Sequence, residues 1–180
     1  KKKLEDVEVF KMDSAVFMSA IEKVVFAAAV DESRPVLNGV RISSEESGLQ
    51  MVATDGYRLS IETIEMEDKI RLPELLVPGK ALKELIRIFP SDKEFKIALT
   101  SRENQVIFEF EDIEIVTRLI EGEFPQFEKI IPEEGKTKVF IEKEPLERAI
   151  RATAIFARES ANIMKMESDE QKICISSNAA

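Results

Sequence analysis

The sequence of 180 residues contains no histidine and a single cysteine, and these two scarcities remove several classes of site. Histidine is the commonest general base near neutral pH and the commonest zinc ligand, so Ser-His-Asp, Cys-His and histidine-rich zinc sites are excluded. Cys174 cannot form a disulfide within the chain. Because it lies in the alternating run KICIS, we predict a small core residue in a reducing compartment.

Long apolar runs are also missing. No run reaches the roughly 18 residues that a membrane helix needs, and the start KKKLEDVEVF lacks the apolar stretch of a secretory signal. We therefore expect a cytoplasmic protein. The 35 acidic and 26 basic residues give a net charge of −9, which argues against a surface that is basic all over but leaves room for a local basic face.

Alternation and helical periodicity predict an α+β fold, in the order β-α-β-β-β-α-β-β. The first helix, AVFMSAIEKVVFAAA, follows the strand VEVFKM and has Asp13 or Ser14 as N-cap. The second, KALKELIRIF, has Leu82, Leu85 and Phe89 on one face. The remaining segments are predicted strands: PVLNGVRIS, GLQMVATDGYRLSIETIEM, ELLVP, EFKIALTS and QVIFEFEDIEIVTRLI.

The segment EGEFPQFEKIIPEEGK breaks every periodicity with two prolines and two glycines, as an interdomain linker does. After it, KVFIEKEPLERAIRATAIFA repeats the first strand and helix at an offset of about 130 residues, and IMKMES and QKICISS repeat two later strands. The second copy stops before its remaining elements, which leaves strand edges uncovered. We therefore expect the chain to be a fragment of a duplicated protein.

A polar cluster, Thr54 to Arg58 in VATDGYRLS, interrupts an apolar run. One interpretation is an enzyme site in which Asp55 and Arg58 pair in a cleft and Tyr57 acts as a general acid. No nucleophile and base pair, phosphate loop or spaced carboxylate cluster supports it. The plainer interpretation is a hairpin turn, for which Asp-Gly is a strong signal.

Basic residues recur on the polar faces of the predicted helices. Lys80, Lys83 and Arg87 are spaced i, i+3, i+7, whereas the mostly extended stretch 41–70 holds three basic and seven acidic residues. For one helix this is an ordinary solvated face. Repeated on several helices, it indicates a shared basic surface that contacts phosphates without reading sequence.

The segments RPVLNGVRI, LQMVATDGYRLS, LLVPGKALKEL and LIEGEFPQFEKIIP, in this order, resemble the bacterial DNA polymerase III beta subunit, the sliding clamp. The resemblance runs from about Val7 to Pro132 and more weakly to Ala180. It implies a DNA clamp fold with repeated domains, antiparallel sheets outside and helices lining one face. Residues 1–121 would be its complete second domain, 122–136 a linker, and 137–180 the incomplete start of its third domain.

The function implied by the resemblance is that of a non-catalytic subunit of the DNA polymerase III holoenzyme, without cofactor or metal. Such a processivity factor forms a head-to-tail homodimeric ring around double-stranded DNA, independent of sequence. It tethers the polymerase III alpha subunit, the clamp loader and repair polymerases through short clamp-binding peptides. The alternative is a truncated paralogue, a peptide-binding adaptor that does not encircle DNA.

The resemblance also implies two sets of site residues. The peptide pocket, between the second and third domains, would be formed by Arg34, Leu37, Thr54, Gly56, Tyr57, Arg58, Leu59, Pro125, Lys129 and Ile130. Leu37, Leu59 and Ile130 would bury apolar side chains of a partner, while Arg58 and Thr54 would fix its backbone. Lys80 matches a basic position facing the hole, and helical geometry adds Lys23, Lys83, Arg87, Arg148 and Arg151 as DNA-facing residues.

Some positions depart from the family pattern. Tyr57 stands where many members have histidine. The tyrosine keeps a flat ring, but the chain loses a group that titrates near neutral pH. Pro35 and Val36 replace aromatic residues proposed to touch DNA in some members, so no DNA contact is expected there.

Overall fold

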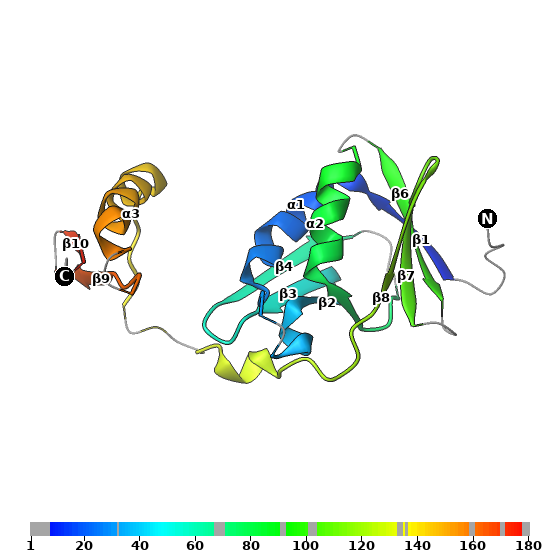
Figure 1. Cartoon of the computed structure of the whole chain (residues 1–180), viewed down its shortest axis with the longest axis horizontal. Coiled ribbons are helices and arrows are strands. Elements are labelled where there is room, and N and C mark those ends of the chain that lie inside the picture. The colour runs from blue at the N-terminus through cyan, green and yellow to red at the C-terminus, as the bar shows by residue number, and fades with distance from the viewer. Residues whose placement is uncertain are drawn as a thin grey trace. The chain divides into compact units, whose positions relative to one another are not determined.

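The computed structural model divides the chain into two compact units, Lys1–Ile131 and Pro132–Ala180, which are described separately (Figure 1). It describes residues 8–31, 33–66, 71–90, 93–100, 104–132, 135, 137–158, 161–169 and 172–177. No helix in these ranges is long and apolar enough to cross a membrane.

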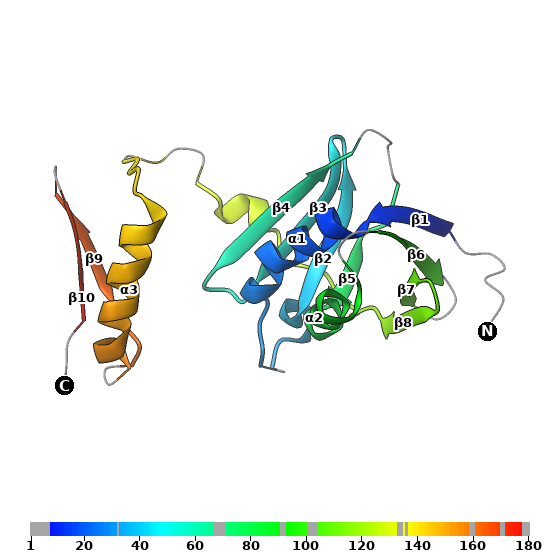
Figure 2. The same ribbon diagram turned by 90° about the horizontal axis from the view of Figure 1, so that it is seen from above.

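The described residues of unit 1 form two antiparallel four-stranded sheets with strand orders β1-β6-β7-β8 and β4-β3-β2-β5. The strands are β1 (Glu8–Asp13), β2 (Gly39–Glu45), β3 (Gly48–Thr54), β4 (Leu59–Glu65), β5 (Leu75–Pro78), β6 (Glu94–Thr100), β7 (Gln105–Phe110) and β8 (Ile113–Arg118). Helices α1 (Ser14–Val24) and α2 (Gly79–Ile88) lie side by side against the second sheet (Figure 2). The main core lies between these helices and both sheets.

Helix α1 begins where the sequence predicts it but ends at Val24, and Val25–Ala27 form a 3-10 helix, η1. The Asp13 side chain accepts a hydrogen bond from the backbone N–H of Val16 at 2.9 Å, which satisfies a donor of the first turn. Phe17, at 0% exposure, packs its ring 5.1 Å from that of Phe95 and 6.4 Å from that of Phe108. The helix is thereby joined to strands β6 and β7 by aromatic contacts.

Two predicted strands differ from the structure. The first half of PVLNGVRIS is a 3-10 helix, η2 (Pro35–Asn38), because Pro35 begins the turn with its fixed φ and without an N–H. QVIFEFEDIEIVTRLI folds back on itself as β7–β8. GLQMVATDGYRLSIETIEM folds back as β3–β4 at Asp-Gly, which confirms the hairpin interpretation of that turn. Each run is too long for one strand of a small sheet and reverses at a polar pair or cluster.

The stretch after β8 packs on unit 1 rather than leaving it at residue 122. Phe124 and Phe127 are buried against Val52 and Leu76, and Phe127 begins the short 3-10 helix η3 (Phe127–Ile130). The two units separate after Ile131. Two apolar rings therefore hold the first ten residues of the expected linker on the sheet, although the assignment of the clamp domains stays a prediction.

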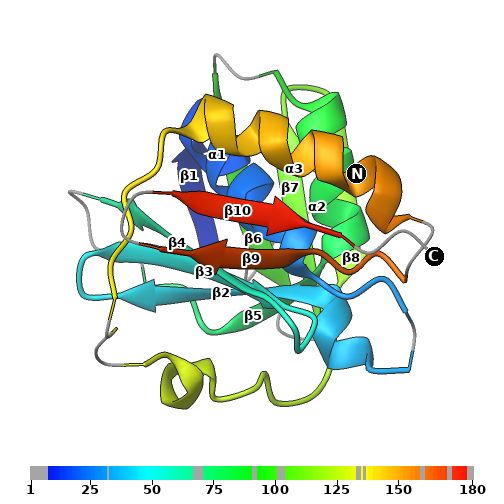
Figure 3. The same ribbon diagram turned by 90° about the vertical axis from the view of Figure 1, so that its left-hand side faces the viewer.

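Unit 2 consists of helix α3 (Lys143–Ala157) and the antiparallel pair β9 (Lys165–Ser168) and β10 (Ile173–Ser176), which lies beside the helix (Figure 3). The predicted strand at 138–142 is not extended in a sheet. Its counterpart β1 pairs with β6, and no equivalent of β6 is present in the described part of unit 2.

Cys174 is exposed, so the prediction of a core cysteine was wrong. Its neighbours Ile173 and Ile175 alternate with it along β10 and are partly buried, whereas Cys174 and Ser176 point to the open face. The alternation was therefore predicted correctly, but it places the thiol on the face that no described residue covers.

Candidate functional site

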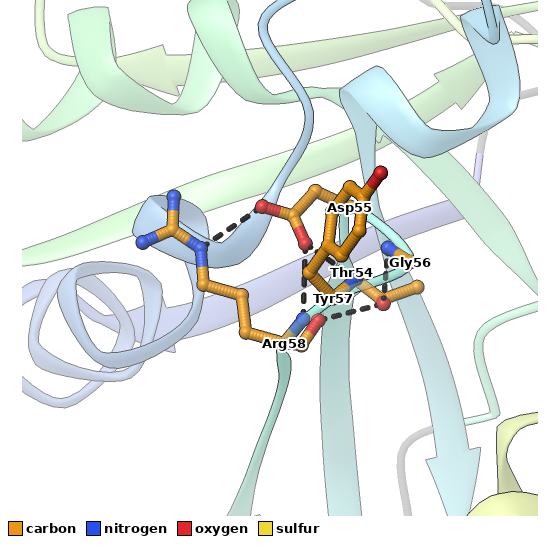
Figure 4. Close-up of polar contacts among 5 residues, drawn as sticks. All are labelled: Thr54, Asp55, Gly56, Tyr57 and Arg58. Carbon is orange, nitrogen blue, oxygen red and sulfur yellow. Dashed lines mark hydrogen bonds and ion pairs between the residues drawn. The ribbon is translucent and has the colours of Figure 1, made fainter. Parts of the chain in front are cut away.

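The cluster TDGYR is the turn of the β3–β4 hairpin. Thr54 pairs with Leu59, so residues 55–58 form the loop, and Gly56 adopts a φ of +91° that side chains disfavour. The Asp55 carboxylate accepts hydrogen bonds from the backbone N–H groups of Tyr57 (2.9 Å) and Arg58 (3.0 Å) (Figure 4). One side chain therefore fixes the loop conformation, as in an Asx turn.

Thr54 closes the turn from inside. Its hydroxyl donates to the carbonyl oxygen of Arg58 at 2.7 Å and accepts from the backbone N–H of Gly56 at 3.1 Å. The residue is 5% exposed. The turn therefore uses the donor and one of the two acceptor lone pairs of the hydroxyl, so Thr54 shapes the loop, and its contact with a partner backbone stays a prediction.

Arg58 is held on two sides. Its Nε donates to Asp55 Oδ2 at 3.0 Å, and its guanidinium carbon lies 5.6 Å from the ring centroid of Phe26, which is half exposed. Phe26 was not among the predicted site residues, because nothing in its own segment shows that it approaches the turn. The pair with Asp55 leaves the terminal nitrogens of Arg58 pointing away from the turn (Figure 4).

These contacts also change the pKa of the Asp55 carboxyl group. The backbone N–H of Tyr57, followed by the N–H and the charge of Arg58, lowers the pKa of Asp55 below the usual value of 3.8. Asp55 is thus ionised at neutral pH and acts as an acceptor. The predicted pair of Asp55 and Arg58 exists, but it holds a surface loop, and Tyr57 beside it is fully exposed rather than enclosed in a cleft.

Arg34 and Leu37 both lie in the segment before β2, but only Arg34 is seen at the turn. The Nη1 atom of Arg34 lies 3.4 Å from the position that a Cβ on Gly56 would occupy. Leu37 is only 7% exposed. The structure therefore brings Arg34 to the loop as a surface group, whereas Leu37 is a buried residue of η2.

Leu59 and the linker residues meet on the outer face of the sheet. Leu59 packs partly buried on a second cluster formed by Val52, Leu76, Phe124 and Phe127. Pro125 and Lys129 are exposed, and Ile130 is 69% exposed. Of the three predicted apolar contact residues, Ile130 thus offers the largest free surface.

A family model described as the central domain of the DNA polymerase III beta subunit matches residues 11–126. The chain belongs to this family. The beta sliding clamp of Staphylococcus aureus is 31% identical over 173 residues, which cover 96% of this chain and 46% of that protein. The beta sliding clamp of Halalkalibacterium halodurans is 30% identical over 162 residues, covering 88% and 42%.

Solved structures agree with this membership. The sliding clamp from Bacillus subtilis matches with a TM-score of 0.88 at 28% identity, over 99% of this chain and 47% of that one. The beta chain from Streptococcus pneumoniae matches with a TM-score of 0.89 over 97% and 47%, at 24% identity. The predicted α+β clamp fold is confirmed, and the chain spans about half the length of the beta subunits that it matches.

The six predicted DNA-facing cations of this beta-subunit chain fall into two groups. Lys23 pairs with Glu62, Arg87 with Glu84, Arg148 with Glu144 and Arg151 with Glu147. Lys80 and Lys83 are exposed and form no ion pair with any residue in the described ranges. The predicted positive charge on the helices is clearest on α2, which carries three basic residues and one acidic residue. Helix α1 carries one residue of each sign.

Proposed function

We propose that this chain is the central part of a sliding clamp, a non-catalytic processivity factor of DNA replication that encircles duplex DNA as a homodimeric ring in the cytoplasm. Its membership of the beta subunit family and the clamp fold support the proposal. A device that slides must not read bases, and unpaired lysines that contact phosphates suit this requirement. Lys80 and Lys83 on α2 are the best placed of the predicted cations.

The site at the β3–β4 turn would recruit the replicative polymerase, the clamp loader and repair polymerases through short peptides. The observation that carries this proposal is the arrangement around Arg58. Its guanidinium is fixed by Asp55 and Phe26, yet its terminal nitrogens donate to no residue in the described part of the chain. Leu59 on this hairpin packs on the cluster that includes Phe127, and the exposed Ile130 follows Phe127 in η3. Together they offer apolar surface on which a partner leucine or phenylalanine can be buried.

The test is a titration of the 180-residue chain with a fluorescein-labelled peptide copied from the clamp-binding motif of the replicative polymerase. We expect saturable binding, and we expect Arg58→Ala with Ile130→Ala to weaken it at least tenfold. The loss of a charge-assisted hydrogen bond and of apolar contact supports that magnitude. Both side chains are largely exposed, so the variant should fold normally.

Val116→Ala with Lys96→Ala is the matched control, because it removes an exposed apolar residue and a cation from β8 and β6. Its affinity should equal that of the unchanged chain. Equal affinity of the site variant and the control would show that the peptide does not bind at the turn.

A further inference from the structure

Arg41 lies on the outer face of the second sheet, the face on which Leu59 of the proposed peptide site also packs. In β2 it is paired with Val52 of β3 and Leu76 of β5, and residues directly opposite each other in neighbouring strands project to the same face. Its neighbours Val40 and Ile42 point to the main core. Arg41 therefore shares the face on which Phe124 and Phe127 pack.

The side chain of Arg41 contacts two consecutive residues of η3. Its guanidinium carbon lies 5.6 Å from the ring centroid of Phe127, and its Nη1 lies 3.8 Å from Glu128 Oε1. Glu74 fixes the guanidinium from the other side, since Nε donates to Glu74 Oε2 at 2.9 Å. The Arg41 side chain is only 17% exposed, so its cation is shielded from water. A contact between a cation and a ring face is stronger when it is shielded in this way.

The segment that Arg41 contacts has few other attachments. In the described part of the chain, its last backbone hydrogen bond to the sheet runs from the Ile120 N–H to the Leu76 carbonyl. Between there and Ile131, the contacts with the sheet and η2 include Phe124 and Phe127 in the second cluster, Gly122 against Val36, and Arg41 on η3. A 3-10 helix of four residues has little stability of its own, so its position depends on them.

We propose that Arg41 is a positioning residue for the peptide site. The two residues that follow its contacts on η3 are Lys129 and Ile130, which form the linker side of that site, so the clasp formed by Arg41, Glu74, Phe127 and Glu128 holds this wall in place before a peptide arrives. The inference rests on the proposed peptide-binding function. It assigns to Arg41 a role that the sequence did not indicate.

The clasp has a kinetic signature. We call η3 docked when it is held against the sheet by these contacts. If a peptide binds only the docked form, its apparent affinity equals the intrinsic affinity multiplied by the fraction of molecules in which η3 is docked. A smaller docked fraction then lowers the association rate. A residue that touched the peptide would act mainly on the dissociation rate. Arg41→Leu keeps the apolar stem against the sheet and removes the cation and both carboxylate contacts.

The experiment measures association and dissociation of the fluorescein-labelled polymerase peptide by stopped flow on the 180-residue chain and its variants. For Arg41→Leu we expect association to slow about tenfold, the scale of a shielded cation and ring contact, with dissociation changed less than twofold. Arg41→Lys, which keeps a cation over Phe127, should recover part of the rate. Lys96→Leu, which removes a paired cation from β6, should leave it unchanged.

Amide hydrogen exchange of the same variants supplies a second readout without peptide. In Arg41→Leu we expect exchange of Phe127–Ile131 to rise about tenfold while β3 keeps its protection. Equal association rates in Arg41→Leu and the unchanged chain would overturn the inference alone, as would a loss of protection throughout unit 1. No binding of the peptide to the unchanged chain would instead overturn the proposed function and the inference with it.

Discussion

Single side chains at the β3–β4 turn perform more than one task. Asp55 orders the loop through two backbone N–H groups and orients Arg58 through its other carboxylate oxygen. Thr54 closes the loop from inside. Because the same carboxylate orders the loop and orients Arg58, its protonation is expected to affect both.

Asp55→Asn tests the structural part of this coupling. The folded pKa of Asp55 is lowered, chiefly by the N–H of Tyr57, so its stabilising effect is present above the unfolded pKa of about 3.9. That effect is lost as the pH falls through the lower folded pKa. Near pH 7 we expect the variant to be less stable by about 1 kcal/mol, because asparagine still accepts a hydrogen bond but loses the extra strength of a bond to a charged group.

Urea unfolding of both proteins between pH 7 and pH 2 measures the difference. It should shrink toward zero at the acidic end, since a protonated Asp55 resembles asparagine. A difference that stays constant over this range would mean that the charge of Asp55 does not stabilise the turn.

At the scale of elements, the spacing of apolar residues and the capping residues predict those helices and strands that depend on local sequence alone. The apolar stripes of α1 and α2 and the cap at Asp13 follow from the sequence, and the structure confirms them. The 3-10 turn at Pro35 and the absence of a strand at 138–142 do not follow, because the first depends on where pairing with β5 begins and the second on a missing partner strand.

The candidate site divides in the same way. The motif around Asp55 marks the turn, and the resemblance to clamps identifies its surface residues. Phe26 and Arg41 could not be found, since each acts through a neighbour 32 or 86 positions away that only the fold brings near. A cation on an exposed strand position has the same sequence pattern whether it meets water or a buried ring.

Helix α2 carries the sharpest prediction about DNA. Lys80 and Lys83 have no ion pair with a described residue, whereas Arg87 is paired with Glu84. A cation that is already paired gains less from a phosphate, so the two lysines should dominate. Anisotropy of a fluorescent DNA duplex at several salt concentrations measures their contribution.

For Lys80→Ala with Lys83→Ala we expect the slope of log affinity against log salt to become shallower by about 1.8, because each phosphate contact contributes roughly 0.9. Arg87→Ala should change the slope by less than half of that. A larger effect of Arg87→Ala than of the double lysine variant would contradict a DNA-facing role for the two lysines.

At the scale of the whole chain, the position of the domain end bears on the site. The sequence places this end at residue 121, where periodicity stops, while the contacts place it after Ile131. The ten residues between carry Phe124, Phe127 and the linker side of the proposed peptide site. If they belong to the folded domain, the site has two of its walls on a single folded unit.

Two truncations distinguish these boundaries. Residues 1–131 contain every member of the main core and of the second cluster, so this piece should unfold cooperatively, with the same midpoint as the main transition of the whole chain. Residues 1–121 lack Phe124 and Phe127 and leave Val52 and Leu76 uncovered. Losing two buried rings, less the entropy regained by the released segment, should reduce the free energy of unfolding by at least about 2 kcal/mol. Urea unfolding followed by circular dichroism measures the stability of both pieces. Equal stabilities would show that residues 122–131 do not stabilise the domain and act only as a linker. The wall formed by Lys129 and Ile130 would then not be fixed before a peptide binds.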